Sequence, residues 1–544
     1  VAVLGAWLAW AVWLVRYPIL GADSMIYHLP EIMQWVHNGH PGKVSSLFPG
    51  YPVGAYPISN EVLLEWATGI SRSFVPAMLA APTMLLLVGA AGWVGLRSLA
   101  VERWPAGLTV ATLCLTPGLT HWQKNGAHTD LPAIAWLVTA AALCAASRRR
   151  PSLLAPMIVA AGLAVGTKTT TLPLTALLLV IAGVIHRERL RPMARPLALA
   201  TAAALVAGGT WYFRNLILHG SPLWPFVATP WGDAVPKVIA PSGHVVPQVY
   251  TSFLDTPGTT TRFIVNKSAD PFAGGLLMTA CALVAPFIAR RREVTAAAVT
   301  TLASLLIWMN APFTGVPEGK VATPGGLTTM RYLLPTFTVA ALTLALATRE
   351  RRTRAYGMVA LVASLGLTLL QLFDLGYPSV PGPSTPLAGA ALAVLGAAAL
   401  AFVLRGRAPS MRAIGLATLP ALVVAGLALS VAASGFVERY NTANVPESRR
   451  LYSATPAMFD WFLGRSDFAD GHKTIAFTVV MNAALAGDHL QHRIDLVSAL
   501  EGCDRVRRLA RTGWVIVNHA WPTRPCLTHL RPIWSGGEFA VYGR

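Results

Sequence analysis

Charged residues are scarce in this chain. Only 12% of its 544 residues are Asp, Glu, Lys or Arg, against about 25% in an ordinary soluble domain. The hydrophobic 54% of the sequence gathers in blocks of about 17 to 22 residues, the length that a helix needs to cross a membrane core of about 30 Å. A water-soluble globular protein is therefore excluded, and the blocks are too long for the alternating strands of an outer-membrane barrel. The sequence predicts an all-α polytopic membrane protein.

Acidic residues are fewer than basic ones, with 24 Asp and Glu against 43 Lys and Arg, for a net charge of +19. Such an excess can indicate nucleic-acid binding, but no motif with interleaved aromatic residues accompanies it, so nucleic acid is set aside as a partner. The basic residues instead mark every second loop between apolar blocks, the positive-inside pattern of cytoplasmic loops. These loops are 97–103, 148–150, 187–195, 290–292, 349–354 and 405–412.

About thirteen transmembrane helices are predicted within residues 1–434, and we expect this part to be a transmembrane catalytic module in the cell (inner or plasma) membrane. The first block is interpreted as a retained span rather than a cleaved signal peptide. The predicted spans are 1–20, 75–97, 105–121, 131–147, 152–167, 170–185, 197–213, 272–289, 294–310, 332–348, 355–373, 386–404 and 413–434.

Two large segments are expected on the extracytoplasmic face within this module, opposite the arginine-rich loops. The first outer loop, 21–74, has apolar residues at helical spacing, which predict two amphipathic helices along the outer interface. They are Ile32, Trp35 and Val36, then Val62, Leu63, Trp66 and Ile70. The second segment is the large loop 214–271.

The last segment, 435–544, turns polar and predicts a small extracytoplasmic α/β domain. Strand-like runs at 474–480 and 514–519 lie on either side of a helix-like stretch that begins at Cys503. Of the five cysteines, Cys503 and Cys526 alone lie in this domain. We expect them to form a disulfide, because an oxidising compartment permits one.

Ionisable residues gather at the outer ends of the predicted spans. They are Asp23, Lys124, Asp130, Lys168, Arg214 and Arg331. Any one of the cations could be an interfacial anchor, since Lys and Arg snorkel to the membrane surface. As a set they indicate chemistry, because a reaction that expels a phosphate needs cations for the departing anion and a carboxylate to take a proton from the nucleophile.

The motifs that carry these residues form an ordered series from the first span to Arg331-Tyr332. They are GADSMIYHLP with Asp23, NGAHTDLP with Asp130, Gly162-x-x-x-Gly166-Thr-Lys168, Trp211 and Arg214-Asn215 before Gly220-x-Pro-x-x-Pro-Phe226, and Arg331-Tyr332 before Leu-Leu-Pro. This layout resembles the GT-C superfamily of polyprenyl-phosphate-sugar-dependent glycosyltransferases. Within it, the chain looks like the glycosyltransferase family 39-like branch of protein O-mannosyltransferase-like and lipid A aminoarabinose transferase-like proteins.

The resemblance implies a sugar donor on undecaprenyl or decaprenyl phosphate, with its lipid tail in a groove between spans and the first outer loop as a lid. It makes Asp23 and Asp130 the catalytic residues. It assigns the donor phosphate to Lys168, Arg214 and Arg331. It assigns three further residues to the acceptor side or the lid: His28, Glu61 and Glu65.

One departure from the family pattern concerns the residue after Asp23. Many relatives have an Asp-Glu pair there, and in this chain Ser24 replaces the Glu. The role of general base therefore rests on Asp23 alone, and a divalent metal stays open as a cofactor. The His-rich stretch His37 to His40 could bind metal, but a solvated turn is the favoured interpretation.

The function predicted is an inverting hexosyl- or pentosyltransferase that moves a sugar from a polyprenyl-phosphate carrier to a cell-envelope glycan, lipid or protein on the extracytoplasmic face. The alternative is a transporter or flippase of lipid-linked sugars. A transporter usually shows paired half-repeats and polar residues on broken helices at mid-membrane, and the sequence shows neither clearly. A third interpretation, a scaffold that presents the C-terminal domain, leaves the outer-face charges without a purpose.

Overall fold

The computed structural model describes most of the chain between Asp23 and Gly543. The residues that it does not describe are 1–10, 12–13, 16–17, 19–22, 42–51, 120–126, 238, 241–248, 251–253, 255–256, 313–329, 375–434, 436, 443–454, 478–482, 498–501, 520–523 and 544.

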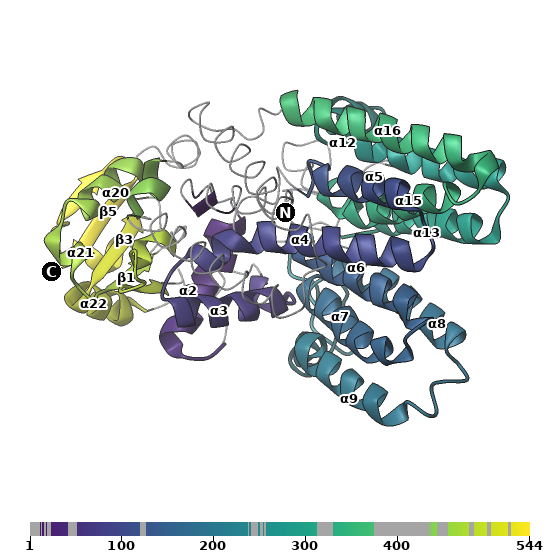
Figure 1. Cartoon of the computed structure of the whole chain (residues 1–544). Coiled ribbons are helices and arrows are strands. Elements are labelled where there is room, and N and C mark those ends of the chain that lie inside the picture. Colours follow the sequence, from purple (N-terminus) through teal and green to yellow (C-terminus); the bar gives the residue numbers. More distant parts are fainter. Residues whose placement is uncertain are drawn as a thin grey trace, which may run out of the picture.

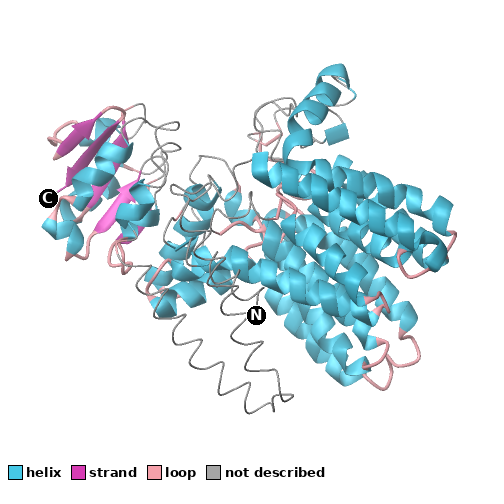
Figure 2. Cartoon of the chain, turned by 45° about the horizontal axis from the view of Figure 1, so that its top comes forward, coloured by secondary structure: helices cyan, strands magenta, loops and turns pink. Residues whose placement is uncertain are grey.

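Helices dominate the described residues, and a small sheet lies at the C-terminal end (Figures 1 and 2). The first outer loop contains a π-helical turn, η1 (Ser24–His28), followed by α2 (Leu29–Asn38) and α3 (Ser59–Ser71). The next helices are α4 (Val75–Ser98), α5 (Arg103–Leu115), α6 (Asp130–Ser147), α7 (Leu154–Thr167), α8 (Leu172–Ile185), α9 (Ala194–Ala204) and α10 (Thr210–His219). A second group contains α12 (Pro257–Ala289), α13 (Arg292–Met309), α15 (Leu334–Ala347) and α16 (Arg351–Asp374).

Six helices in the described part of the chain are long and apolar enough to cross a membrane. They are Val75–Ser98, Asp130–Ser147, Ala194–His219, Phe272–Ala289, Arg292–Met309 and Arg351–Gln371. A helix lies over each predicted span between residues 75 and 373, so the prediction of a multi-pass helical membrane protein is confirmed. The spans 386–404 and 413–434, and nearly all of 1–20, lie outside the described residues, and the count of thirteen stays a prediction.

Two helices differ from their predicted bounds. α5 ends at Leu115, because Thr116 precedes Pro117 and has the extended ψ of 125° that a following proline favours. α12 begins at Pro257, well before the predicted start of its apolar stretch at 272. Neither difference changes the connectivity of the bundle.

Glycines let α7 approach the helix formed by α9, the π-helical segment η5 (Leu205–Gly209) and α10. A Cβ atom on Gly208 would overlap the carbonyl oxygen of Gly162, and one on Gly162 would lie 2.7 Å from the Cα atom of Ala204. The two backbones are therefore in direct contact, as is common where small residues line membrane helices. This contact fixes the end of α7 and the Gly166-Thr167-Lys168 turn that follows it.

The C-terminal domain is a five-stranded sheet of order β2-β1-β3-β5-β4, with β1 parallel to β2 and β3, and β5 antiparallel to β3 and β4. Helix α20 (Thr455–Leu463) packs on one face and α22 (Cys503–Thr512) on the other. The strands are β1 (Thr474–Phe477), β2 (Arg493–Leu496), β3 (Trp514–Asn518), β4 (Trp534–Gly536) and β5 (Phe539–Gly543). The predicted α/β character is confirmed.

The predicted disulfide is also present. Cys503, at the start of α22, is bonded to Cys526, with 4.9 Å between their Cα atoms. It ties α22 to the short 3-10 helix Arg524–Leu527 that precedes β4.

The C-terminal domain rests on α2 (Figure 1). His37 donates from Nε2 to the Leu490 carbonyl at 3.1 Å, and Arg493 donates to Asn38 at 3.1 Å. On α2, Ile32 and Trp35 are buried inside the protein, and the position of α2 along the membrane interface stays a prediction. Helix α3 does leave its apolar face uncovered, with Trp66 67% and Ile70 79% exposed.

Candidate active site

Four of the residues singled out in the sequence form one chain of ion pairs. Arg331 donates from Nη1 to Asp23 Oδ2 at 2.8 Å, and its Nε lies 3.7 Å from Asp130 Oδ2. Lys168 donates from Nζ to the other carboxylate oxygen of Asp130. The order is Asp23, Arg331, Asp130 and Lys168, so anions and cations alternate.

Helix ends bring these side chains together. Asp23 comes just before η1, and Asp130 is the first residue of α6, where a carboxylate is favoured by the helix dipole. Lys168 directly follows α7, and Arg331 opens the 3-10 turn η8 (Arg331–Leu333) that leads into α15.

Hydrogen bonds from a threonine within the turn after α7 stabilise that turn. Thr171 donates from Oγ1 to the carbonyls of Lys168, at 2.8 Å, and of Ala164, at 3.0 Å. The position of Lys168 therefore follows from the end of α7, which the glycine contact with η5 fixes.

Tyr332 lies beside both cations. The Lys168 ammonium is 4.7 Å from the centre of the Tyr332 ring, and the Arg331 guanidinium is 5.5 Å from it. A cation near an aromatic face is stabilised by the ring quadrupole. The Arg331-Tyr332 pair of the sequence motif is thus one unit, in which the tyrosine supports the cations.

The two carboxylates differ in accessibility. The side chain of Asp130 is 5% exposed and lies between Lys168 and Arg331, whereas the side chain of Asp23 is 32% exposed. Asp23 is therefore the carboxylate that an incoming molecule can reach. Within the described residues its side chain makes no capping hydrogen bond to η1.

The electrostatics of Asp23 are set by its neighbours. Burial by itself would raise the pKa of Asp23, but Arg331, His128 and His28 outweigh it and hold that pKa well below its ordinary value. Burial lowers the pKa of His128 to about 4, so this imidazole is neutral at pH 7. In the free protein Asp23 is an ionised carboxylate engaged by Arg331.

A second polar cluster lies between α2 and α3, next to Asp23. His28 bonds through Nδ1 to Glu61 Oε1 of α3, and both side chains are buried. Glu65 follows Glu61 by one turn of α3 and is also buried. The three residues assigned to the acceptor or lid are thus on the inner side of the first outer loop.

Glu31 belongs to this cluster and was not singled out in the sequence. It is 3% exposed, and neither of its carboxylate oxygens has a hydrogen-bond partner among the described residues. Burial and the nearby Glu61 raise the pKa of Glu31 well above its ordinary value, against the opposing charge of Arg214. A signal was present in the sequence, because Glu31 follows His28 by three residues and so shares its helical face.

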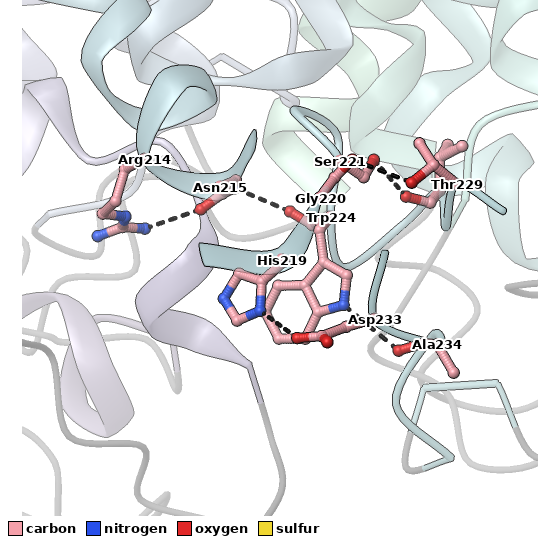
Figure 3. Close-up of polar contacts among 10 residues, drawn as sticks. Arg214, Asn215, His219, Gly220, Ser221, Trp224, Thr229, Asp233 and Ala234 are labelled. Atoms are coloured by element: carbon pink, nitrogen blue, oxygen red, sulfur yellow. Dashed lines mark hydrogen bonds and ion pairs between the residues drawn. The ribbon is translucent and has the colours of Figure 1, made fainter. Parts of the chain in front are cut away.

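Arg214 lies apart from the chain of ion pairs. It donates to the carbonyl of Gly54 in the first outer loop and, at 3.3 Å, to the side chain of Asn215. Asn215 donates to the carbonyl of Ala55 at 2.8 Å. It also donates to the carbonyl of Trp224, at 2.9 Å (Figure 3). The Arg214-Asn215 pair thus holds the segment around Gly54 against the loop that follows α10.

That loop carries the Gly-x-Pro-x-x-Pro-Phe motif, and contacts between its own residues stabilise its conformation (Figure 3). His219 bonds to Asp233 at 2.8 Å and stacks on Trp224 with 3.6 Å between ring centres. Gly220 ends α10 with a φ of 71°, a conformation that favours glycine. Phe226, the last residue of the motif, stacks on Tyr56 at 5.5 Å, so the motif supports the first outer loop.

Among the described residues, no group of three or more His, Cys, Asp and Glu side chains is arranged to hold a metal ion. In the His-rich stretch, His37 uses both ring nitrogens on the carbonyls of Met33 and Leu490, and His40 is exposed. Lys124 lies outside the described residues.

Comparison with known proteins places this geometry in a known fold. No protein-family model matches the chain, and no curated protein matches its sequence. Among solved structures, the chain is similar to the crystal structure of ArnT from Cupriavidus metallidurans bound to undecaprenyl phosphate, with a TM-score of 0.51 and 15% sequence identity. The match covers 99% of this chain and 97% of ArnT. The chain therefore has the fold of ArnT, in line with the resemblance to aminoarabinose transferase-like proteins seen in the sequence.

Proposed function

We propose that the protein is a membrane glycosyltransferase whose donor is a sugar carried on a polyprenyl phosphate. The observation that carries this proposal is the ion-pair chain of Asp23, Arg331, Asp130 and Lys168, assembled from four helix ends. The similarity to ArnT, whose crystal structure holds undecaprenyl phosphate, supports a lipid phosphate as the group that the cations meet.

The chemistry follows from the charges. Lys168 and Arg331 bind the donor phosphate and stabilise the negative charge that builds up on it as the bond to the anomeric carbon breaks. Asp23 takes the proton from the acceptor hydroxyl, whose oxygen forms the new bond from the opposite side. The sugar changes its configuration, and the polyprenyl phosphate leaves.

Arg331 connects donor binding with the activity of the base. In the free protein its guanidinium engages Asp23, which makes the carboxylate a weak base. A phosphate that binds Arg331 competes for the same donor groups and weakens that ion pair. Asp23 therefore becomes a stronger base when the donor is bound. Without a donor, its ion pair with Arg331 keeps it from accepting a proton.

Asp130 has a different role in this proposal. It lies between Lys168 and Arg331 and contacts both, so it spaces and orients the two cations. A bidentate or bridging carboxylate of this kind is stable when buried because it is paired on both sides. We assign it to positioning of the phosphate site.

The remaining site residues belong to the first outer loop. We propose that His28, Glu61 and Glu65 line the acceptor side or the lid, since all three lie on the inner side of α2 and α3. Arg214, the third cation assigned to the phosphate, would reach it by exchanging the Gly54 carbonyl for a phosphate oxygen. The site and residues 435–544 face the extracytoplasmic side of the cell membrane, where the acceptor is a cell-envelope glycan, lipid or protein.

The experiment that tests the function uses the full-length protein in lipid nanodiscs with a panel of undecaprenyl-phosphate-linked sugars. Release of undecaprenyl phosphate, measured by mass spectrometry, is the expected result. The same donors in proteoliposomes test the alternative. Movement of an intact lipid-linked sugar across the bilayer, without consumption, would identify a flippase and refute the transferase.

A further inference from the structure

Asp23 must lose a proton after every sugar transfer, and the residues that surround it include a buried histidine–carboxylate pair. His28 follows Asp23 by five residues, within the π-helical turn η1, and bonds through Nδ1 to Glu61 of α3. His28 is 4% exposed and Glu61 is fully buried. A buried histidine is often only a packed side chain. The groups around His28 decide whether it is packed in this way or takes part in proton transfer.

The carboxylate of Glu61 selects the tautomer of His28. Because a carboxylate accepts a hydrogen bond, the proton of the neutral imidazole lies on Nδ1, which leaves the lone pair on Nε2. An imidazole held in this way can take a second proton at Nε2, and the resulting imidazolium is stabilised by the carboxylate. His28 is therefore prepared to accept a proton.

The charged and titratable groups around the pair come from several elements. Asp23 lies on the same turn as His28, and His128, which precedes α6, has its ring centre 6.5 Å from that of His28. Tyr27 packs on His28 at 4.0 Å. Glu61 faces Glu31 of α2, which in turn faces Arg214. His28 alone among these groups is close to Asp23 and bonded to the second cluster.

Unpaired polar atoms continue from this pair along the interface of α2 and α3. Glu61 Oε2, both oxygens of Glu31, Asn60 Nδ2 and Glu65 Oε2 are buried and have no hydrogen-bond partner among the described residues. Buried polar atoms of this kind are usually satisfied by water. Water between carboxyl groups can conduct a proton, and the last of these carboxyl groups, Glu65, interacts electrostatically with the exposed His40.

We propose that His28, held by Glu61, takes the proton from Asp23 after each sugar transfer and passes it toward solvent along these buried polar atoms between α2 and α3. This inference rests on the proposed glycosyltransferase function. The proton that leaves the acceptor hydroxyl moves first to Asp23 and then to His28 Nε2, and it ends on water. No other bond forms or breaks in these steps, and Asp23 is restored as a carboxylate that can pair again with Arg331.

The test separates the first turnover from the following ones. Asn at position 28 keeps a side-chain N–H for Glu61 but cannot carry a proton. With the acceptor held at a saturating concentration, so that weaker acceptor binding does not limit the rate, His28→Asn should therefore complete one round of sugar transfer at close to the normal rate, while its steady-state rate falls by about 10²-fold, the scale of a positioned proton transfer. Glu61→Gln should show the same pattern. Rapid-quench measurement of undecaprenyl phosphate release gives both rates.

His37→Gln is the matched control, because His37 lies on α2 and, among the described residues, bonds only to backbone carbonyls. It should leave both rates unchanged. A His28→Asn protein with normal steady-state turnover would overturn the relay, and so would a loss of the first turnover together with the later ones, which indicates a structural role. If the unmodified protein consumes no polyprenyl-phosphate sugar, the proposed function itself fails. Normal consumption with an unaffected His28→Asn variant refutes only the relay.

Discussion

Arg331 and Asp23 are 308 residues apart in the sequence, and their side chains meet at 2.8 Å. The pair joins the first outer loop to the start of α15, so it links the lid side of the site to the helical bundle. It also means that the base and a phosphate-binding cation satisfy each other when no donor is bound. Replacement of Asp23 should therefore slow turnover without weakening donor binding, whereas replacement of Arg331 should impair both.

Asp23→Asn keeps the shape of the side chain and removes its basicity. Turnover should fall by about 10² to 10⁴, the usual worth of a positioned general base. Donor affinity should stay the same or rise, because Arg331 loses its competing carboxylate. Titration with undecaprenyl phosphate and a turnover assay on the same preparation measure the two effects, and normal turnover would move the search for the base to Asp130.

Arg331→Lys and Lys168→Ala should both weaken donor binding. A hydrogen bond to a charged group contributes about 1.5 to 3 kcal/mol, so each change should raise the Kd for undecaprenyl phosphate by about 10- to 100-fold. Arg331→Lys keeps the charge but loses the planar fork, and it should also slow turnover. Arg352→Lys, in the arginine-rich loop at the start of α16, is the control, and equal affinities in all four proteins would reduce these cations to interfacial anchors.

Gly208→Ala tests the contact that positions Lys168. The new Cβ atom would overlap the Gly162 carbonyl, so α7 and η5 must move apart, at a cost of about 1 to 3 kcal/mol for an overpacked contact. We expect a lower thermal unfolding temperature in detergent and weaker donor binding. Gly183→Ala on α8 is the matched control, because a Cβ atom there meets no atom within 4 Å, and it should behave as the unmodified protein does.

The acid stability of the C-terminal domain should depend on Asp467. Hydrogen bonds from Arg465, at 2.7 and 2.8 Å, and from Lys473, at 2.8 Å, hold the pKa of Asp467 well below its ordinary value. A lowered pKa in the folded state adds stability above the unfolded value, about 3.9, and this stability is lost as the pH falls through the folded value. Hydrogen exchange at β1 should accelerate in that acid range, and Asp467→Asn should remove this part of the pH dependence.

The membrane topology is open to a direct test. Reporter fusions after Arg150 and Arg292 should give cytoplasmic signals, and a fusion at residue 440 should give alkaline phosphatase activity, because arginine-rich loops stay in the cytoplasm. The opposite pattern would place Asp23, Asp130, Lys168 and Arg331 on the cytoplasmic face. The reaction would then need a donor from that side.

Hydropathy and composition were enough to predict a helical membrane protein, the helices between residues 75 and 373 and the α/β character of the last segment. These are local properties, because a membrane span and a strand are recognised within one short window of sequence. The side chains Asp23, Asp130, Lys168 and Arg331 could also be chosen, since an ionisable residue at the end of an apolar block is costly without a partner.

The identity of the partners depended on how the helix ends meet. Nothing near Arg331 in the sequence indicates that it pairs with Asp23 and Asp130, or that Arg214, an equally plausible cation, binds the Gly54 carbonyl instead. Glu31 is a buried carboxylate without a hydrogen-bond partner among the described residues because α2 is covered by the C-terminal domain and faces α3. Electrostatic partners are set by distances across the folded chain, and these distances come from helix packing over hundreds of residues rather than from neighbours in the sequence.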